Sequence, residues 1–266
     1  MPGAPAIGDR LRDWRERRRL SQMALALQAE VSTRHLSFVE TGRSQPGRAL
    51  IVRLADELQI PLRERNGLLI AAGFAPVFEF RRFDDPSFDP VRTVIDITLE
   101  RHKPFPAYLI DRQWNVVISN AAVPELVEGV DAELLRPPVN MVRMMLHPRG
   151  LAERIQNFGV WWSYLVAQIR RQIDLTADPR LEQLLRETLS YSTRPTDAAA
   201  YGEAGRPAVP LDISTRIGQL SFIGATTVFG GPLDATLDEI AIEALHPADA
   251  FTEEAVRRAV AAASTA

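Results

Sequence analysis

The stretch LSQMALALQAEVSTRHLSFVETGRSQPG, residues 20–47, decides the fold of the amino-terminal part of the chain. Ser21 and Ser32 each stand directly before a short helical pattern, where a serine side chain can accept a hydrogen bond from a backbone N–H of the first turn. Gly42 follows the second pattern, at the position where glycine commonly ends a helix. The stretch therefore predicts two short helices that meet across Ala29-Glu30-Val31, although such a turn often contains glycine.

Three further helices are predicted around this pair. One begins at Ile7, one spans residues 48–58 and one begins at Pro61, and each repeats apolar residues every three or four positions. That spacing gives each helix one apolar face, which is buried when helices pack together. A glycine ends the last helix, and prolines, aromatic residues and charges without a regular period follow it. We therefore expect an all-α domain of five helices over residues 6–74 and a linker over residues 75–89.

The composition narrows the possible functions. The 266 residues include no cysteine, which excludes disulfides, iron–sulfur clusters and thiolate metal sites. Arginine supplies 30 of the 31 basic residues, so Lys103 is the only candidate for a Schiff-base or phosphate-binding lysine. Residues 1–75 hold 12 arginines and 8 acidic residues, a net charge of +4, whereas the rest of the chain carries −7. This division is typical of a protein whose basic part binds an anionic polymer such as DNA.

The residues at the start of the second short helix suit contacts with DNA. In a helix-turn-helix, the first helix crosses the DNA backbone and the first turn of the second helix lies in the major groove. An arginine there can bind guanine by two hydrogen bonds, a threonine or phenylalanine can contact a thymine methyl group, and Gln22 and Arg43 are placed for phosphate. The predicted DNA-binding residues are Gln22, Ser32, Thr33, Arg34, His35, Ser37, Phe38 and Arg43.

The remainder of the chain predicts an α+β domain over residues 90–251, followed by a helix or tail over residues 252–266. It opens with a helix, after which the runs AYLI and NVVIS predict the two strands of a β-hairpin. Further strands are expected at VPLDIS and QLSFIGATTVF, because both runs are rich in β-branched and aromatic residues. Strands and helices in this order are typical of an antiparallel sheet with helices beside it.

Helices and a loop are predicted between and after these strands. Apolar residues repeat at spacings of four and three from Leu151 to Ile173, which predicts one long amphipathic helix, and Leu181 to Leu189 predicts another. Residues 193–208 are small, polar and interrupted by glycine and proline, so they are expected to form a loop. The carboxy-terminal part predicts short helices on both sides of His246-Pro247.

A pocket for an apolar ligand can be assembled from this second domain. Methionines adapt to irregular shapes, aromatic rings supply contact area, and an arginine can hold a carboxylate by two hydrogen bonds. The adjacent Trp161 and Trp162 cannot share one helix face, so one of them requires a second partner. The same residues also fit an ordinary core, and the two arginines fit a solvated surface. The candidate ligand-binding residues are Met141, Arg143, Met144, Met145, Arg154, Phe158, Trp161, Trp162 and Phe222.

Residues 20–47 resemble the DNA-binding domain of the Xre-type repressors, and LADELQIPLRERNGLLIAAGFAP resembles the MmyB-like branch of that family. The segments PAYLIDRQWNVVISNAA, NMVRMMLHPRGL and FGGPLDATLDEIAIEALHPAD resemble the PAS-like ligand-binding domain of the same branch. The resemblance implies a bacterial transcription regulator that forms a homodimer, binds a double-stranded DNA operator and responds to a small apolar effector. Long-chain acyl compounds are the ligand class that the resemblance implies.

Other functions find less support in the residues. The four histidines are scattered and no GxGxxG, HExxH, GxSxG or Walker sequence occurs, so we expect neither an enzyme nor a bound metal or cofactor. No apolar run approaches the roughly 20 residues that span a bilayer, and the first residues lack the apolar core of a signal peptide. The protein is therefore expected to be cytoplasmic and not to bind membranes. Two alternatives stay open: a helical bundle whose polar faces are only hydrated, and a ligand-carrying or protein-interaction module whose helix-turn-helix does not read DNA.

Overall fold

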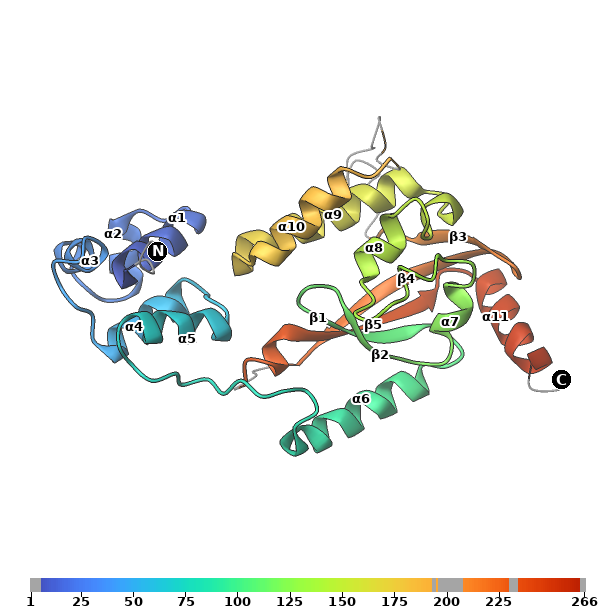
Figure 1. Cartoon of the computed structure of the whole chain (residues 1–266), viewed down its shortest axis with the longest axis horizontal. Coiled ribbons are helices and arrows are strands. Elements are labelled where there is room, and N and C mark those ends of the chain that lie inside the picture. The colour runs from blue at the N-terminus through green and yellow to red at the C-terminus, as the bar shows by residue number, and fades with distance from the viewer. Residues whose placement is uncertain (1–5, 193–194, 196–207, 230–233, 264–266) are drawn as a thin grey trace. The chain divides into compact units, whose positions relative to one another are not determined.

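The chain forms two compact units, and the first boundary between them in the sequence lies between Arg82 and Phe83 (Figure 1). The computed structural model describes residues 6–192, 195, 208–229 and 234–263. The first unit, here called the helical domain, is all-α, and residues 174–177 and 234–238 are grouped with it. The second unit, here called the sheet domain, combines a curled antiparallel sheet with helices. The predicted fold class, a five-helix domain followed by an α+β domain, is confirmed.

The helices of the helical domain begin at the predicted residues or within one residue of them. The side-chain oxygen of Ser21 accepts a hydrogen bond from the N–H of Ala24 at 3.0 Å, and that of Ser32 accepts from the N–H of His35 at 3.1 Å. Glu30 holds the turn with a φ of 51°, a left-handed conformation in which glycine is usual. The helices are α1 (Ile7–Arg17), α2 (Gln22–Gln28), α3 (Thr33–Glu40), α4 (Arg48–Glu57) and α5 (Leu62–Ala71).

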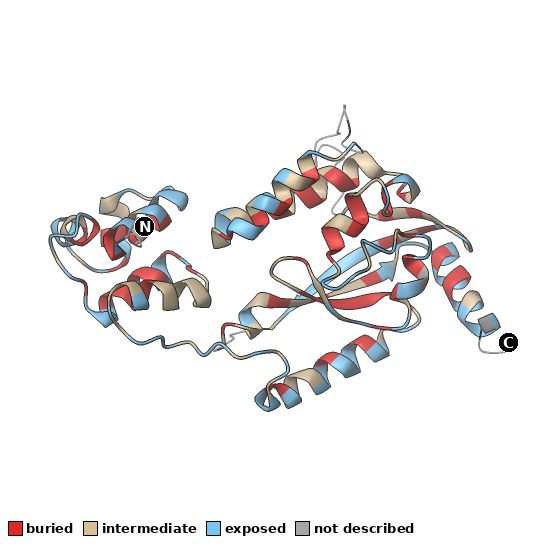
Figure 2. Ribbon diagram, viewed as in Figure 1, coloured by how far each residue is buried: buried red, intermediate tan, exposed pale blue. Residues whose placement is uncertain are grey.

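One hydrophobic core joins these helices (Figure 2). Each helix contributes at least one side chain that is almost fully buried, including Leu11, Leu25, Leu36, Ile51 and Leu69. Burying a leucine or isoleucine side chain stabilises the folded state by about 1.5–3 kcal/mol relative to leaving it in water. The apolar periodicity read from the sequence is therefore the feature that holds the five helices together.

Helices α1 and α3 approach each other closely at Gly8. A Cβ atom on this residue would lie 2.4 Å from the carbonyl oxygen of Val39 and 2.8 Å from that of Glu40. Gly8→Ala is therefore expected to lower the free energy of unfolding of the helical domain by about 1–3 kcal/mol, because backbone has to move. Scanning calorimetry of the full chain measures this change.

Gly67→Ala supplies the matched control for Gly8→Ala. Gly67 lies within α5, and an added Cβ atom would have its nearest neighbour, Nη1 of Arg10, at an ordinary 3.6 Å. Alanine is a better helix former than glycine, so this variant should gain about 0.5–1 kcal/mol. Equal effects of the two substitutions would show that the contact at Gly8 is not tight.

The segment 77–81, here called the strap, is bound to the helical domain although the sequence predicts a linker there. The side-chain oxygen of Asn66 on α5 accepts the N–H groups of Val77 and Phe78 at 3.0 and 3.1 Å, and its amide nitrogen donates to the carbonyl of Phe78 at 2.5 Å. At the next residue of the strap, the carbonyl of Glu79 accepts the N–H of Ala235 at 2.9 Å. The strap therefore has a fixed path within the helical domain.

The sheet domain is built on a five-stranded antiparallel sheet in the order β2-β1-β5-β4-β3. The predicted hairpin is confirmed as β1 and β2, and helices separate this hairpin from the later strands. The strands are β1 (Ala107–Asp111), β2 (Val116–Ser119), β3 (Leu211–Thr215), β4 (Gly218–Val228) and β5 (Ile240–Pro247). The α-helices that follow α5 in the described chain are α6 (Asp89–Arg101), α7 (Val123–Leu126), α8 (Met141–Leu146), α9 (Phe158–Thr176), α10 (Pro179–Leu189) and α11 (Ala250–Ala263), and the short 3₁₀ helices are η1 (Pro86–Phe88), η2 (Ala152–Arg154) and η3 (Leu237–Glu239).

The helix predicted before His246-Pro247 is wrong, because this segment is β5, the central strand of the sheet. Its alanines, glutamate and leucine favour a helix locally. Ile240 and Ile242 alternate with less buried residues, however, and β5 hydrogen-bonds to β1 on one edge and to β4 on the other. Pairing on both edges outweighs the local helix propensity. The helix predicted after Pro247 is confirmed as α11.

The long helix predicted from Leu151 begins later than expected, at Phe158. Residues 152–154 form η2, and Ile155 makes an isolated β-bridge with Ile213 of β3. The side chains at these positions keep the helical spacing, but their backbone is bound to a strand that lies far away in the sequence. The loop predicted at 193–208 lies almost entirely outside the described residues. None of the helices in the described part of the chain is both long and apolar enough to cross a membrane.

Candidate DNA-binding surface and ligand pocket

The first turn of α3 presents polar side chains to solvent. Ser32, Thr33, Arg34 and His35 are all exposed, whereas Leu36 is buried in the core of the helical domain. The N-cap bond of Ser32 fixes where this turn begins. An exposed polar first turn on a helix anchored by its buried face is the geometry with which a recognition helix reaches base edges.

Arg34 and Phe38 form a pair on the outer side of α3. The guanidinium carbon of Arg34 lies 5.3 Å from the centre of the Phe38 ring, within the range of a cation–π contact. Phe38 is half-buried, as is Ser37, so this ring is less exposed than its place in the sequence predicts. Arg43 follows the end of α3 and is exposed, and its backbone N–H donates to the carbonyl of Phe38 at 2.8 Å.

Glu40, the last residue of α3, is a functional candidate that sequence reasoning missed. Its side chain is fully buried and accepts hydrogen bonds from Nε and Nη2 of Arg15 on α1, at 2.7 and 2.9 Å. It also accepts Nε2 of Gln22 at 2.8 Å, so this predicted phosphate ligand is bound within the protein through its side-chain amide. The spacing in the sequence could have indicated that both side chains face the core. Glu40 lies four residues after the buried Leu36, and Arg15 lies four residues after Leu11, so each shares a helix face with a core leucine.

The surroundings of Glu40 keep its carboxyl group charged. Burial alone would raise its pKa, but the hydrogen bonds from Arg15 and Gln22 and the charges of Arg15 and Arg12 hold the pKa of Glu40 below its ordinary value. A buried carboxylate with these partners ties the end of α3 to α1 and to the start of α2. The ion pair therefore sets the orientation of the helix that carries Arg34.

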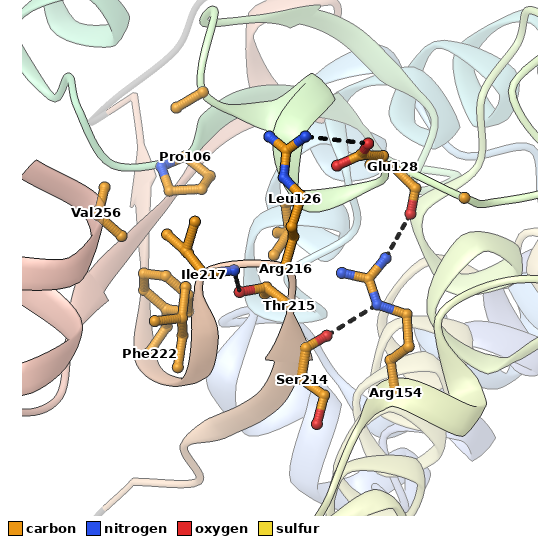
Figure 3. Close-up of a pocket in the computed structure, with 13 residues that line it drawn as sticks. Pro106, Leu126, Glu128, Arg154, Ser214, Thr215, Arg216, Ile217, Phe222 and Val256 are labelled. Carbon is orange, nitrogen blue, oxygen red and sulfur yellow. Dashed lines mark hydrogen bonds and ion pairs between the residues drawn. The ribbon is translucent and has the colours of Figure 1, made fainter. Parts of the chain in front are cut away.

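A pocket of about 360 Å³ opens in the sheet domain (Figure 3). The β3–β4 hairpin forms one side of it, and the rest comes from α7 with its flanking residues, from η2, from α11 and from the residue before β1. Its lining is mostly apolar. The lining residues are Pro106, Ala122, Leu126, Glu128, Gly129, Arg154, Ser214, Thr215, Arg216, Ile217, Leu220, Phe222 and Val256.

Arg154 brings a positive charge to this pocket. Its Nε donates to the carbonyl of Ser214 at 3.0 Å and its Nη1 to the carbonyl of Glu128 at 2.7 Å, as the dashed lines in Figure 3 show. Within the described residues it forms no ion pair, although the Glu128 carboxylate pairs with the exposed Arg216 at 3.6 Å. Burial lowers the pKa of Arg154 and the charge of Glu128 partly opposes this. The geometry leaves N–H groups of a partly desolvated guanidinium available to an anion.

Most of the other candidate ligand-binding residues lie elsewhere in the sheet domain. Phe222 lines the pocket with Arg154, whereas the guanidinium of Arg143 donates twice to Glu187, at 2.8 Å in each bond. Trp161 and Trp162 are both buried, and the indole N–H of Trp161 has no hydrogen-bond partner in the described part of the chain. The core residues of the sheet domain outside the pocket include Met141, Met144, Met145, Trp161 and Trp162, with Phe158 packed against them.

Models of protein families match both parts of the chain. A helix-turn-helix domain model matches residues 6–68, which makes the amino-terminal part a DNA-binding helix-turn-helix domain. The model of the MmyB-like transcription regulator ligand binding domain matches residues 91–259, and the chain belongs to this family of regulators. The resemblance to Xre-type regulators of the MmyB-like branch is thus confirmed. No curated protein matches the chain. The protein is a DNA-binding transcription regulator with a ligand-binding domain.

Proposed function

We propose that this regulator reads a palindromic operator as a homodimer and changes its affinity for DNA when a long-chain acyl acid occupies the pocket of a PAS-like sheet domain. The observation that carries the ligand part is Arg154, a partly buried cation with N–H groups available in a mostly apolar pocket. An apolar chain would fill the pocket and a carboxylate would accept hydrogen bonds from the guanidinium.

The DNA part of the proposal rests on the exposed first turn of α3. Thr33, Arg34 and His35 are placed to contact base edges, and Arg43 to contact a phosphate. Two such helices read one face of a duplex when the half-site centres are about 10 base pairs apart, or a multiple of that distance. This requirement is the reason for proposing a dimer.

The volume of the pocket and the topology of the sheet also support the ligand part of the proposal. The pocket volume of about 360 Å³ falls within the usual range for small-molecule sites. A curled antiparallel sheet with helices between its first hairpin and its later strands resembles a PAS domain. A ligand alters DNA affinity only if it binds more tightly to one arrangement of the protein than to another. We therefore expect the acid to favour one of two arrangements of the dimer.

The test begins with native mass spectrometry of the full-length protein from its expression host, followed by organic extraction. A dimer that carries an acid with an apolar chain is expected, and adding the extracted acid to the stripped protein should change its affinity for operator DNA. A stripped protein that binds DNA equally with and without the acid would contradict the regulatory part. A protein that carries acid but binds no DNA would instead be a ligand-carrying module.

A further inference from the structure

Arg34 and Phe38, which the sequence analysis treats as separate DNA contacts, form a cation–π pair in the structure. They stand four residues apart on α3, so they neighbour each other on the helix surface. Their separation of 5.3 Å places the guanidinium over the ring face. Within the described residues, neither side chain makes a hydrogen bond, an ion pair or another ring contact.

This contact favours one kind of base as the partner of Arg34. The ring contacts the cation through its π face and accepts none of the conventional hydrogen bonds that a guanidinium offers, so the N–H donors of Arg34 stay available. Guanine is the base that offers two adjacent acceptors, O6 and N7, in the major groove. Because the ring already restricts the flexible Arg34 side chain, less conformational entropy is lost when guanine is bound.

The ring of Phe38 suits contact with an apolar group of the DNA. One of its faces is covered by Arg34, and the residue is only half-buried, so apolar ring surface remains outside the core. The C5-methyl group of thymine is the apolar group that base pairs expose in the major groove. When Arg34 contacts a guanine, a ring 5.3 Å from its guanidinium carbon would reach the neighbouring base pair, since successive base pairs lie about 3.4 Å apart.

We propose that Arg34 and Phe38 act as one reading unit for a G·C pair directly flanked by a T·A pair. Arg34 binds O6 and N7 of the guanine and Phe38 packs against the thymine methyl group. This inference rests on the proposed function, in which the protein binds an operator. It adds the identity of one base step in each half-site of that operator.

The experiment selects binding sites from a random-sequence double-stranded DNA library with the full-length protein. The wild type is expected to enrich a half-site that contains this step. Arg34→Gln should lose the preference for guanine and bind the selected duplex about 5- to 150-fold more weakly. Arg53→Gln is the matched control, because Arg53 is exposed on α4 outside the proposed surface, and it should enrich the wild-type site.

A second measurement isolates the methyl group. Replacing the flanking thymine by deoxyuridine removes only this methyl, which should weaken wild-type binding about 4-fold, the effect of one buried carbon. The same replacement should leave Phe38→Ala unaffected. Because the two side chains act together, the double variant should lose less affinity than the product of the two single losses. Circular dichroism of each variant checks that the helices are retained.

The outcomes separate this inference from the function on which it rests. A wild-type protein that enriches no site overturns both operator reading and the reading unit. An enriched site that lacks the step, or one that Arg34→Gln and Phe38→Ala enrich unchanged, overturns the reading unit alone. Independent losses in the double variant would overturn the coupling between the two side chains.

Discussion

Replacing Glu40 by alanine is expected to lower the free energy of unfolding of the helical domain by about 3–5 kcal/mol. The substitution leaves the guanidinium of Arg15 buried without its carboxylate, and the amide of Gln22 loses its partner. Arg15 would keep its hydrogen bond to the carbonyl of Leu20, at 2.9 Å, and the exposed carboxylate of Glu16, at 3.5 Å, but these do not replace the buried carboxylate that balances its charge. The expected loss is a large part of the 5–15 kcal/mol that stabilises a typical domain.

Amide hydrogen exchange of the full-length protein in urea, followed by mass spectrometry, measures this loss in peptides that cover α2 and α3. Glu57→Ala is the matched control, because Glu57 is exposed at the end of α4 and its removal should change stability by less than about 0.5 kcal/mol. Equal exchange in Glu40→Ala and wild type would contradict the structural role of the buried pair.

The same ion pair predicts how the stability of the helical domain depends on pH. Because the folded state holds the pKa of Glu40 below its unfolded value of about 4.3, the contribution is fully present above that value and is lost as the pH falls through the folded pKa. Glu40→Gln removes the titrating group, so its stability should change less with pH in the acid range. Parallel acid unfolding curves for the two proteins would be inconsistent with this assignment.

Replacing Arg154 by glutamine is expected to weaken binding of an apolar acid by about 30-fold or more, since losing one partner of a partly buried charge pair costs about 2–5 kcal/mol. Decanoic acid and decanol are suitable probes, because they share one apolar chain and differ at the head group. Calorimetric titration of the stripped full-length protein should show a large loss for the acid. Binding of decanol should change by less than about 3-fold, since the apolar walls are intact.

Arg216→Gln is the comparison variant for the binding of the acid, because Arg216 lines the same pocket as Arg154. The side chain of Arg216 is 76% exposed, and its pairing with Glu128 is a surface ion pair, whose removal costs about 0–1 kcal/mol. If Arg154→Gln weakened the acid and the alcohol equally, Arg154 would act through its hydrogen bonds to Ser214 and Glu128, and the proposed carboxylate contact would be wrong.

Local patterns predicted much of the fold because many of the deciding interactions are local. Ser21 and Ser32 cap their helices through bonds that span three residues, so their roles can be read from a few letters of sequence. The strand β5 could not be read in this way. Its conformation depends on β1, about 130 residues earlier in the chain, and on β4, and neither partner is visible in the local composition.

The candidate sites follow the same rule. The exposed first turn of α3 depends only on helix geometry, and the structure agrees with the sequence about which of its residues face solvent. The pairing of Arg143 with Glu187 and that of Arg15 with Glu40 join residues 44 and 25 positions apart. Tertiary contacts therefore decide which arginine is neutralised by a partner and which is left for an anion. The periodicity of the sequence does not contain these contacts.

The strap changes where this protein can be divided by engineering. A chimaera that joins α1–α5 to a foreign effector domain directly after Gly73 removes the backbone groups of Val77 and Phe78, to which the side chain of Asn66 is bound. Fusion after Arg82 retains those bonds, although it still loses the donor that Ala235 offers to the strap. The exchangeable module therefore includes the strap, and a fusion point placed directly after the last helix would remove it.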